Sequence, residues 1–158
     1  MKNLKKIMFF AIAIFALTMS SSCSSDDSKD ENETETGFIK FKYNEKSYSY
    51  ESSFISSLNI NISGSEGMDN TYKRVALWLP SDVKVGSHPV VFDLQNLETT
   101  YQASFDFNSE FNNASATSGT INITKVSADR IEGTFSFSGT QNDKTFTVTE
   151  GSFSVEKF

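Results

Sequence analysis

The sequence predicts an all-β domain: an antiparallel, meander-rich sandwich or partly closed barrel of about 8–10 short strands. Three observations support this class. Hydrophobic and polar residues alternate in short runs after residue 37, as they do in strands with one buried face. Clusters of Gly, Ser, Asn and Asp, which favour turns, separate the runs. No long window after Cys23 has the 3.6-residue hydrophobic period of an amphipathic helix.

Six runs carry the alternation, and the side chains expected on their inward faces follow in chain order. They are Leu58, Ile60 and Ile62; Val75, Leu77 and Leu79; Tyr101, Ala103, Phe105 and Phe107; Ile121 and Ile123; Ile131, Gly133, Phe135 and Phe137; and Phe146, Val148, Phe153 and Val155. Their polar partners are largely Ser, Thr and Asn, and threonine suits a pleated surface. Gly133 and Gly151 lie inside these patterns and predict β-bulges or close backbone approaches.

Turns are expected between the runs, on the positions of their Gly, Pro, Asn and Asp residues. They fall at residues 44–46, 64–70, 80–82, 108–119, 127–130 and 139–144.

The first 22 residues have the layout of a bacterial secretory signal peptide, which is removed from the mature protein. Three lysines precede an apolar run, Ile7–Met19, and serines follow it. The apolar run is shorter than the roughly 20 residues that a bilayer-spanning helix needs, although a short uncleaved anchor is the alternative. Residues 1–22 are therefore left out of the fold prediction.

The only cysteine of the chain, Cys23, follows the three small residues 20–22. This arrangement resembles a lipobox, the processing site of bacterial lipoproteins, and the resemblance implies that Cys23 is acylated and becomes the first mature residue. Ser20 stands where the usual pattern has leucine, and the lipoproteins of Bacteroidetes are looser at this position. Cleavage after Ser22 without lipidation is the alternative. A single cysteine cannot form an intramolecular disulfide, so none is expected.

Residues 23–36 join the anchor to the domain. Residues 24–36 contain six acids and one lysine, with no aromatic or aliphatic side chain, so we expect a disordered acidic tether. The stretch "CSSDDSKDE" also resembles the acidic export tag of Bacteroidetes lipoproteins. That resemblance implies a lipid-anchored protein of the outer membrane that faces the cell surface, with the periplasmic leaflet as the second location.

Residues 37–158 are long enough for one domain with a core and too short for two. The whole chain has a formal net charge of −6, and residues 37–158 hold 10 basic and 14 acidic residues. No basic patch is visible in the sequence, so nucleic acid is not an expected partner.

The stretch Ser118–Val155 contains "ITK", "IEGTFSF" and "VTEGSF" in succession. It resembles the C-terminal signature of a family of uncharacterised Bacteroidetes lipoproteins, and "LPSDVKVGSHPV", Leu79–Val90, resembles the middle segment of that family. The resemblance implies an all-β, lipocalin-like or sandwich domain. It implies no activity and transfers no functional residue.

The sequence contains no recognisable catalytic, cofactor or metal site. His88 is the only histidine, and no Gly-x-Ser-x-Gly motif, phosphate-binding glycine loop or dinucleotide fingerprint is present. A zinc site needs several His or Cys ligands. The stretch "SEGMDN" lacks the ligand spacing of a calcium loop. We therefore expect no catalytic residue, no metal and no cofactor. The remaining enzymatic alternative is a hydrolase that uses two of the scattered carboxylates, for which the candidates are Asp93, Glu98, Asp106 and Glu110.

Trp78 and Arg74 are the candidate ligand-binding residues, because both lie opposite the Val75, Leu77 and Leu79 face of their strand. An exposed Trp78 would stack on a sugar ring or a partner peptide, whereas in a curled sheet it would fill a secondary core. The sequence predicts a membrane-anchored, non-catalytic binding module for an extracellular glycan, protein or matrix. The alternative is a lipocalin-like carrier whose aromatic residues line a cavity for a small apolar ligand.

Overall fold

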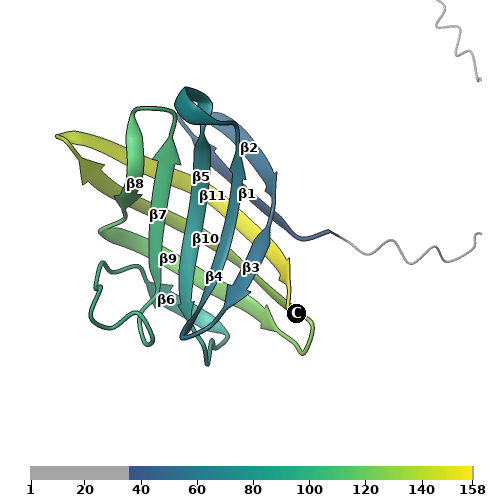
Figure 1. Ribbon diagram of the computed structural model, residues 1–158. Coiled ribbons are helices and arrows are strands. Elements are labelled where there is room, and N and C mark those ends of the chain that lie inside the picture. The colour runs from purple at the N-terminus through teal and green to yellow at the C-terminus, as the bar shows by residue number, and fades with distance from the viewer. Residues whose placement is uncertain (1–35, 158) are drawn as a thin grey trace, which may run out of the picture. The chain divides into compact units, whose positions relative to one another are not determined.

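The computed structural model describes residues 36–157, in which eleven β-strands form two antiparallel sheets packed face to face. Figure 1 shows the strands of one sheet running across those of the other. The predicted all-β class is confirmed, and the architecture is the sandwich rather than the partly closed barrel. The strands number slightly more than the expected eight to ten. The predicted signal peptide, Cys23 and most of the acidic tether lie outside the described residues.

The first sheet has six strands in the order β2–β1–β11–β10–β9–β6. Their bounds are β1 (Phe38–Tyr43), β2 (Lys46–Glu51), β6 (Gly86–Pro89), β9 (Ser118–Val126), β10 (Arg130–Gln141) and β11 (Lys144–Glu156). The second sheet has five strands in the order β3–β4–β5–β7–β8. Their bounds are β3 (Ser53–Ser56), β4 (Asn59–Glu66), β5 (Lys73–Pro80), β7 (Gln102–Phe107) and β8 (Phe111–Ser115).

Tight turns join several neighbouring strands where the sequence predicts them. Asn142 and Asp143 connect β10 to β11 with φ angles of 53° and 61°. Two successive left-handed residues match the right-handed twist of a hairpin, and Asn and Asp tolerate that conformation. The described residues contain one short 3-10 helix, η1 (Asp69–Thr71), and no helix among them is long and apolar enough to cross a membrane.

Aromatic side chains fill the space between the sheets. Phe105 of β7 is completely buried, and its ring centroid lies 5.4 Å from that of Phe146 on β11 and 4.9 Å from that of Tyr43 on β1. The inward alternation is confirmed for nearly every expected position. Leu58 is the exception, because it precedes β4 and its side chain is 72% exposed. Phe107, near the sheet end, is only partly buried.

The two strand glycines mark close approaches and bulges, as expected. The β10–β9 register shifts between Glu132 and Gly133, and the β10–β11 register shifts between Phe135 and Phe137. A Cβ on Gly133 would lie 2.6 Å from the carbonyl oxygen of Asn122, and a Cβ on Gly151 would collide with the Phe135 ring. Glycine therefore lets the chain shift register at both places without losing its buried face.

The expected turn at residues 108–119 is wrong, because this segment contains β8 and the start of β9. Phe111, Ala114 and Ala116 are each 1% exposed, a spacing that departs from period two. The register of β7 and β8 shifts between Phe105 and Phe107, and Asn113 has a φ of 44°. This irregularity interrupts the hydrophobic alternation. The sequence of small and polar residues therefore predicts a turn, although the segment pairs as a strand.

Candidate functional site

The outer face of the five-stranded sheet carries both residues that the sequence selects as binding candidates. Arg74 and Trp78 point away from the core on β5, and the Arg74 guanidinium lies 5.9 Å from the Trp78 ring. Both side chains are half-buried. The expectation that they share a face is therefore met. Trp78 is neither fully exposed nor part of the main core, an intermediate outcome between the two alternatives.

The polar side of β7 on this face is buried, which the alternation does not predict. Gln102, Ser104 and Asp106 are 4%, 3% and 7% exposed. Gln102 pairs with Trp78 on one side, and Ser104 pairs with Ser115 of β8 on the other. Asp106 accepts a hydrogen bond from the Asn113 backbone of β8, whereas Gln102 and Ser104 are hidden because another segment of the chain lies beside them on the outer face.

That segment is the covering loop, residues 91–100, which connects β6 of one sheet to β7 of the other. The Gln102 side chain holds this loop in place. The Nε2 of Gln102 donates to the carbonyl oxygen of Asp93 at 2.6 Å and to Oγ1 of Thr100 at 2.7 Å. The Thr100 hydroxyl in turn donates to the carbonyl oxygen of Asn96 at 2.7 Å. Because Gln102 is itself buried, these bonds hold the start and the end of the loop against the sheet.

Asp93 shapes the inside of the covering loop. Its carboxylate accepts hydrogen bonds from the Asn96 side-chain amide at 2.7 Å and from the Gln95 backbone at 3.0 Å. These bonds hold the pKa of the Asp93 carboxyl below its usual range, the Asn96 bond contributing most. An aspartate that closes a turn on its own following backbone is a common way to stabilise a tight loop. These hydrogen bonds explain Asp93 as a structural residue of the covering loop.

A small pocket, here named the ring pocket, opens between the covering loop and the sheet. Its volume is about 170 Å³. It is lined by Trp78, Phe92, Leu94, Leu97, Gln102, Ala103, Ser104, Asn113 and Ser115. The lining includes no charged side chain. The hydroxyl of Ser104 is buried and has no hydrogen-bond partner among the described residues.

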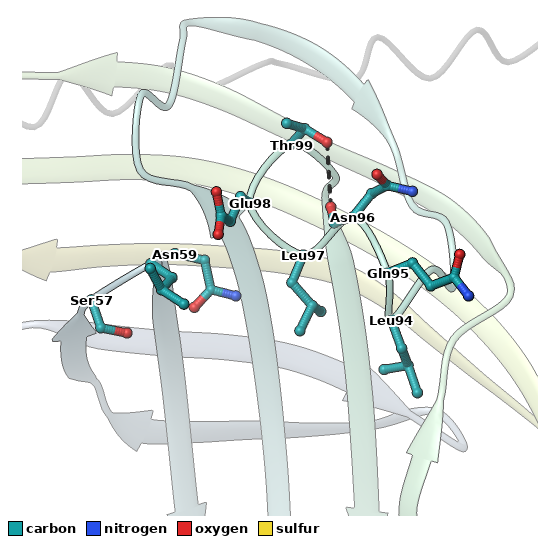
Figure 2. A pocket seen from close by; sticks show the side chains of 9 residues that line it. Ser57, Asn59, Leu94, Gln95, Asn96, Leu97, Glu98 and Thr99 are labelled. Atoms are coloured by element: carbon teal, nitrogen blue, oxygen red, sulfur yellow. Dashed lines mark hydrogen bonds between the residues drawn. The ribbon is translucent and has the colours of Figure 1, made fainter.

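A wider pocket, here named the loop pocket, also borders the covering loop (Figure 2). Its volume is about 480 Å³, and it is lined by Ser57, Leu58, Asn59 and residues 94–99. Leu94 and Leu97 line both pockets and point to the same side of the loop in Figure 2. Together with the exposed Leu58 they give this end of the domain an apolar surface with a polar margin.

The remaining residues considered from the sequence are scattered. The His88 ring stacks on Tyr101, with centroids 3.9 Å apart, and its Nε2 lies 2.9 Å from the carbonyl oxygen of Lys84. Asp106 accepts a hydrogen bond from the Asn113 backbone at 2.6 Å, and Glu110 forms an ion pair with Lys144. Glu98 lines the loop pocket. Within residues 36–157, no three His, Cys, Asp or Glu side chains are grouped to hold a metal ion.

Sequence reasoning missed the Ser104 hydroxyl and the covering loop. Ser104 looks like one more outward serine in an alternating strand, and "VFDLQNLETT" has the polar composition of an exposed connection. The one available signal is the presence of Phe92, Leu94 and Leu97 in an otherwise polar connection. Apolar residues in a connection of this length predict packing against a neighbouring element.

These features define a small all-β sandwich domain with a loop-covered pocket on its outer face. The chain belongs to a family described as a domain of unknown function, DUF6252, whose model matches residues 45–155. The matched region runs from the turn before β2 to the end of the sandwich and includes the covering loop and all residues of the ring pocket. No curated protein and no solved structure matches the chain.

Proposed function

We propose that this protein is a lipoprotein of the outer membrane, anchored through Cys23 and facing the cell surface, whose sandwich domain is a non-catalytic binding module. The ligand is an extracellular glycan, protein or matrix component. The observation that carries the proposal is the ring pocket, which places the half-buried Trp78 beside the polar side chains of Asn113 and Ser115. The support for the lipid anchor comes from the sequence, in which Cys23 follows a signal-peptide pattern and precedes an acidic tether.

The packing between the sheets supports a binding module over a carrier of a small apolar ligand. Phe41, Phe105, Phe111, Phe146 and Phe153 fill the interior with side chains that are at most 2% exposed. The ring and loop pockets instead border the covering loop. Neither pocket, at about 170 Å³ and about 480 Å³, reaches into the aromatic interior between the sheets, where a lipocalin-like carrier would enclose its ligand.

The chemistry of the ring pocket supports binding rather than catalysis. Its lining residues are aromatic, aliphatic, amide and hydroxyl side chains, and none titrates near neutral pH. General acid–base catalysis needs a group that gains or loses a proton close to the working pH. Such a pocket can orient and hold a ligand, but its own side chains offer no proton relay.

The test is a binding screen of the full-length protein against glycans and extracellular proteins, repeated with Trp78→Ala. We expect the ligand that binds the native chain to be lost from the variant. Thr134→Ala is the matched control, because Thr134 is exposed on the six-stranded sheet. A ligand that binds both variants equally well would place the binding surface elsewhere. Trp78→Phe, which keeps an aromatic ring, should retain part of the affinity if both variants fold.

A further inference from the structure

We propose that the ring pocket binds one uncharged pyranose ring, a terminal or side-branch sugar of a larger glycan, with one face of the ring on Trp78. This inference rests on the proposed binding function and names its ligand class. Four features of the pocket carry it: its polar floor, its apolar walls, its size and its lack of charge.

The polar floor comes from two adjacent strands. Ser104 of β7 is 3% exposed, and its Oγ has no hydrogen-bond partner within residues 36–157. Ser115 pairs directly with Ser104 across the β7–β8 ladder, and Asn113 precedes it on the same face of β8. The Ser104 Oγ is closed to solvent, so the polar side chains within reach of a ligand are the half-buried Ser115 and the exposed Asn113. Two adjacent polar side chains suit a ligand that carries several neighbouring hydroxyls, as a sugar does.

The walls of the pocket are apolar. The Trp78 indole stands on β5, and Phe92, Leu94 and Leu97 of the covering loop complete the lining. A pyranose has an apolar face of C–H groups and a polar rim of hydroxyls. A large aromatic ring provides a flat surface for the C–H face, while the hydroxyls at the rim reach the serine and asparagine side chains. A phenol or an alkyl chain would pack against the apolar walls but would form at most one hydrogen bond with the polar side chains of the floor.

The volume of about 170 Å³ limits the ligand to one ring. A cavity of about 150 Å³ accommodates benzene, so the ring pocket holds a single six-membered ring and not two joined sugars. Because a second sugar ring does not fit, the rest of a glycan extends out of the pocket, which is the arrangement expected for a terminal or branching residue.

The charges around the pocket select an uncharged sugar. No Lys, Arg, Asp or Glu lines it. Arg74 lies 5.9 Å from the Trp78 ring in a cation–π contact and is not part of the pocket lining. An acidic sugar would bring a carboxylate into a pocket that offers no cation, and that is unfavourable.

The experiment uses the fact that Trp78 is the only tryptophan of the chain, so intrinsic fluorescence reports directly on the pocket. The full-length protein is titrated with the methyl glycosides of glucose, galactose, mannose and N-acetylglucosamine, and with methyl glucuronide. We expect saturable fluorescence changes with at least one neutral glycoside and none with the glucuronide. Ser115→Ala should weaken that binding by about tenfold, the equivalent of one lost hydrogen bond to the ligand. Ser63→Ala, on the same sheet face but outside the pocket, should bind as the native chain does.

The inference is overturned if no neutral glycoside gives saturation, or if Ser115→Ala binds the sugar as tightly as Ser63→Ala does. Saturation by N-acetyl-tyrosine amide, with none by the glycosides, would show that the pocket takes an aromatic side chain of a protein partner. In that case the sugar assignment fails and the binding module stands. A screened ligand whose binding is indifferent to Trp78→Ala would remove the proposed site itself, and the sugar assignment with it.

Discussion

Phe105 and Ser104 are neighbours on β7 with opposite surroundings, and replacing each by alanine tests the core and the site together. Phe105 is 0% exposed, and its ring contacts five other aromatic rings at centroid distances of 4.9 to 6.2 Å. Removing a fully buried phenylalanine side chain costs about 3–5 kcal/mol. A domain of this size has a total stability of about 5–15 kcal/mol, so Phe105→Ala should lose a large share of it.

Ser104→Ala should behave differently although Ser104 is almost as buried. Its hydroxyl has no hydrogen-bond partner among the described residues, so alanine removes an unsatisfied polar atom and little else. Replacing such a group is close to neutral or stabilising. We expect a change in the free energy of unfolding within about 0.5 kcal/mol, against several kcal/mol for Phe105→Ala.

Urea denaturation of both variants, followed by circular dichroism, measures the two free energies. Equal slopes against denaturant would show that each variant still unfolds as the native chain does. A loss above about 1 kcal/mol for Ser104→Ala would mean that its hydroxyl is hydrogen-bonded in the folded chain. A cost below about 1 kcal/mol for Phe105→Ala would contradict the packing between the sheets.

Four further outcomes follow from the sequence and the structure. Cys23→Ala should move the protein from the membrane to the soluble fraction, and unchanged detergent partitioning would contradict lipidation. Alanine at the four acids of residues 26–31 should leave the melting temperature within about 2 °C, because such a segment buries nothing, while surface protease accessibility on intact cells falls. Phe135→Ala should cost about 3–5 kcal/mol and Ser136→Ala under about 0.5, since Phe135 is 4% exposed and Ser136 is exposed; the reverse order would mean a wrong register. Burial raises the pKa of Tyr50, so the stability that its neutral side chain contributes is complete below about pH 10 and is lost as the pH rises further; Tyr50→Phe, which removes a hydroxyl without a partner among the described residues, should unfold at a higher pH in alkaline titrations.

Local sequence determines the strands and the face that each one buries. Val75, Leu77 and Leu79 are completely buried, as their spacing predicts, because a side-chain period of two is a property of the extended backbone itself. Ile121 and Ile123 follow the same rule. The turn at Asn142 and Asp143 is also local, since both residue types tolerate the left-handed conformation found there. A neighbour or two along the chain is enough to specify each of these features.

Tertiary structure alone decides the site. The sequence places Trp78 and Arg74 on one strand face, but the ring pocket joins β5, β7, β8 and the covering loop, which are distant in the sequence. Period two predicts that Ser104 is exposed, and the packed loop buries it. Burial depends on every segment that lies against a residue, whereas alternation describes only the strand that contains it. The polar floor of the pocket therefore becomes visible only when the strands and the loop are assembled.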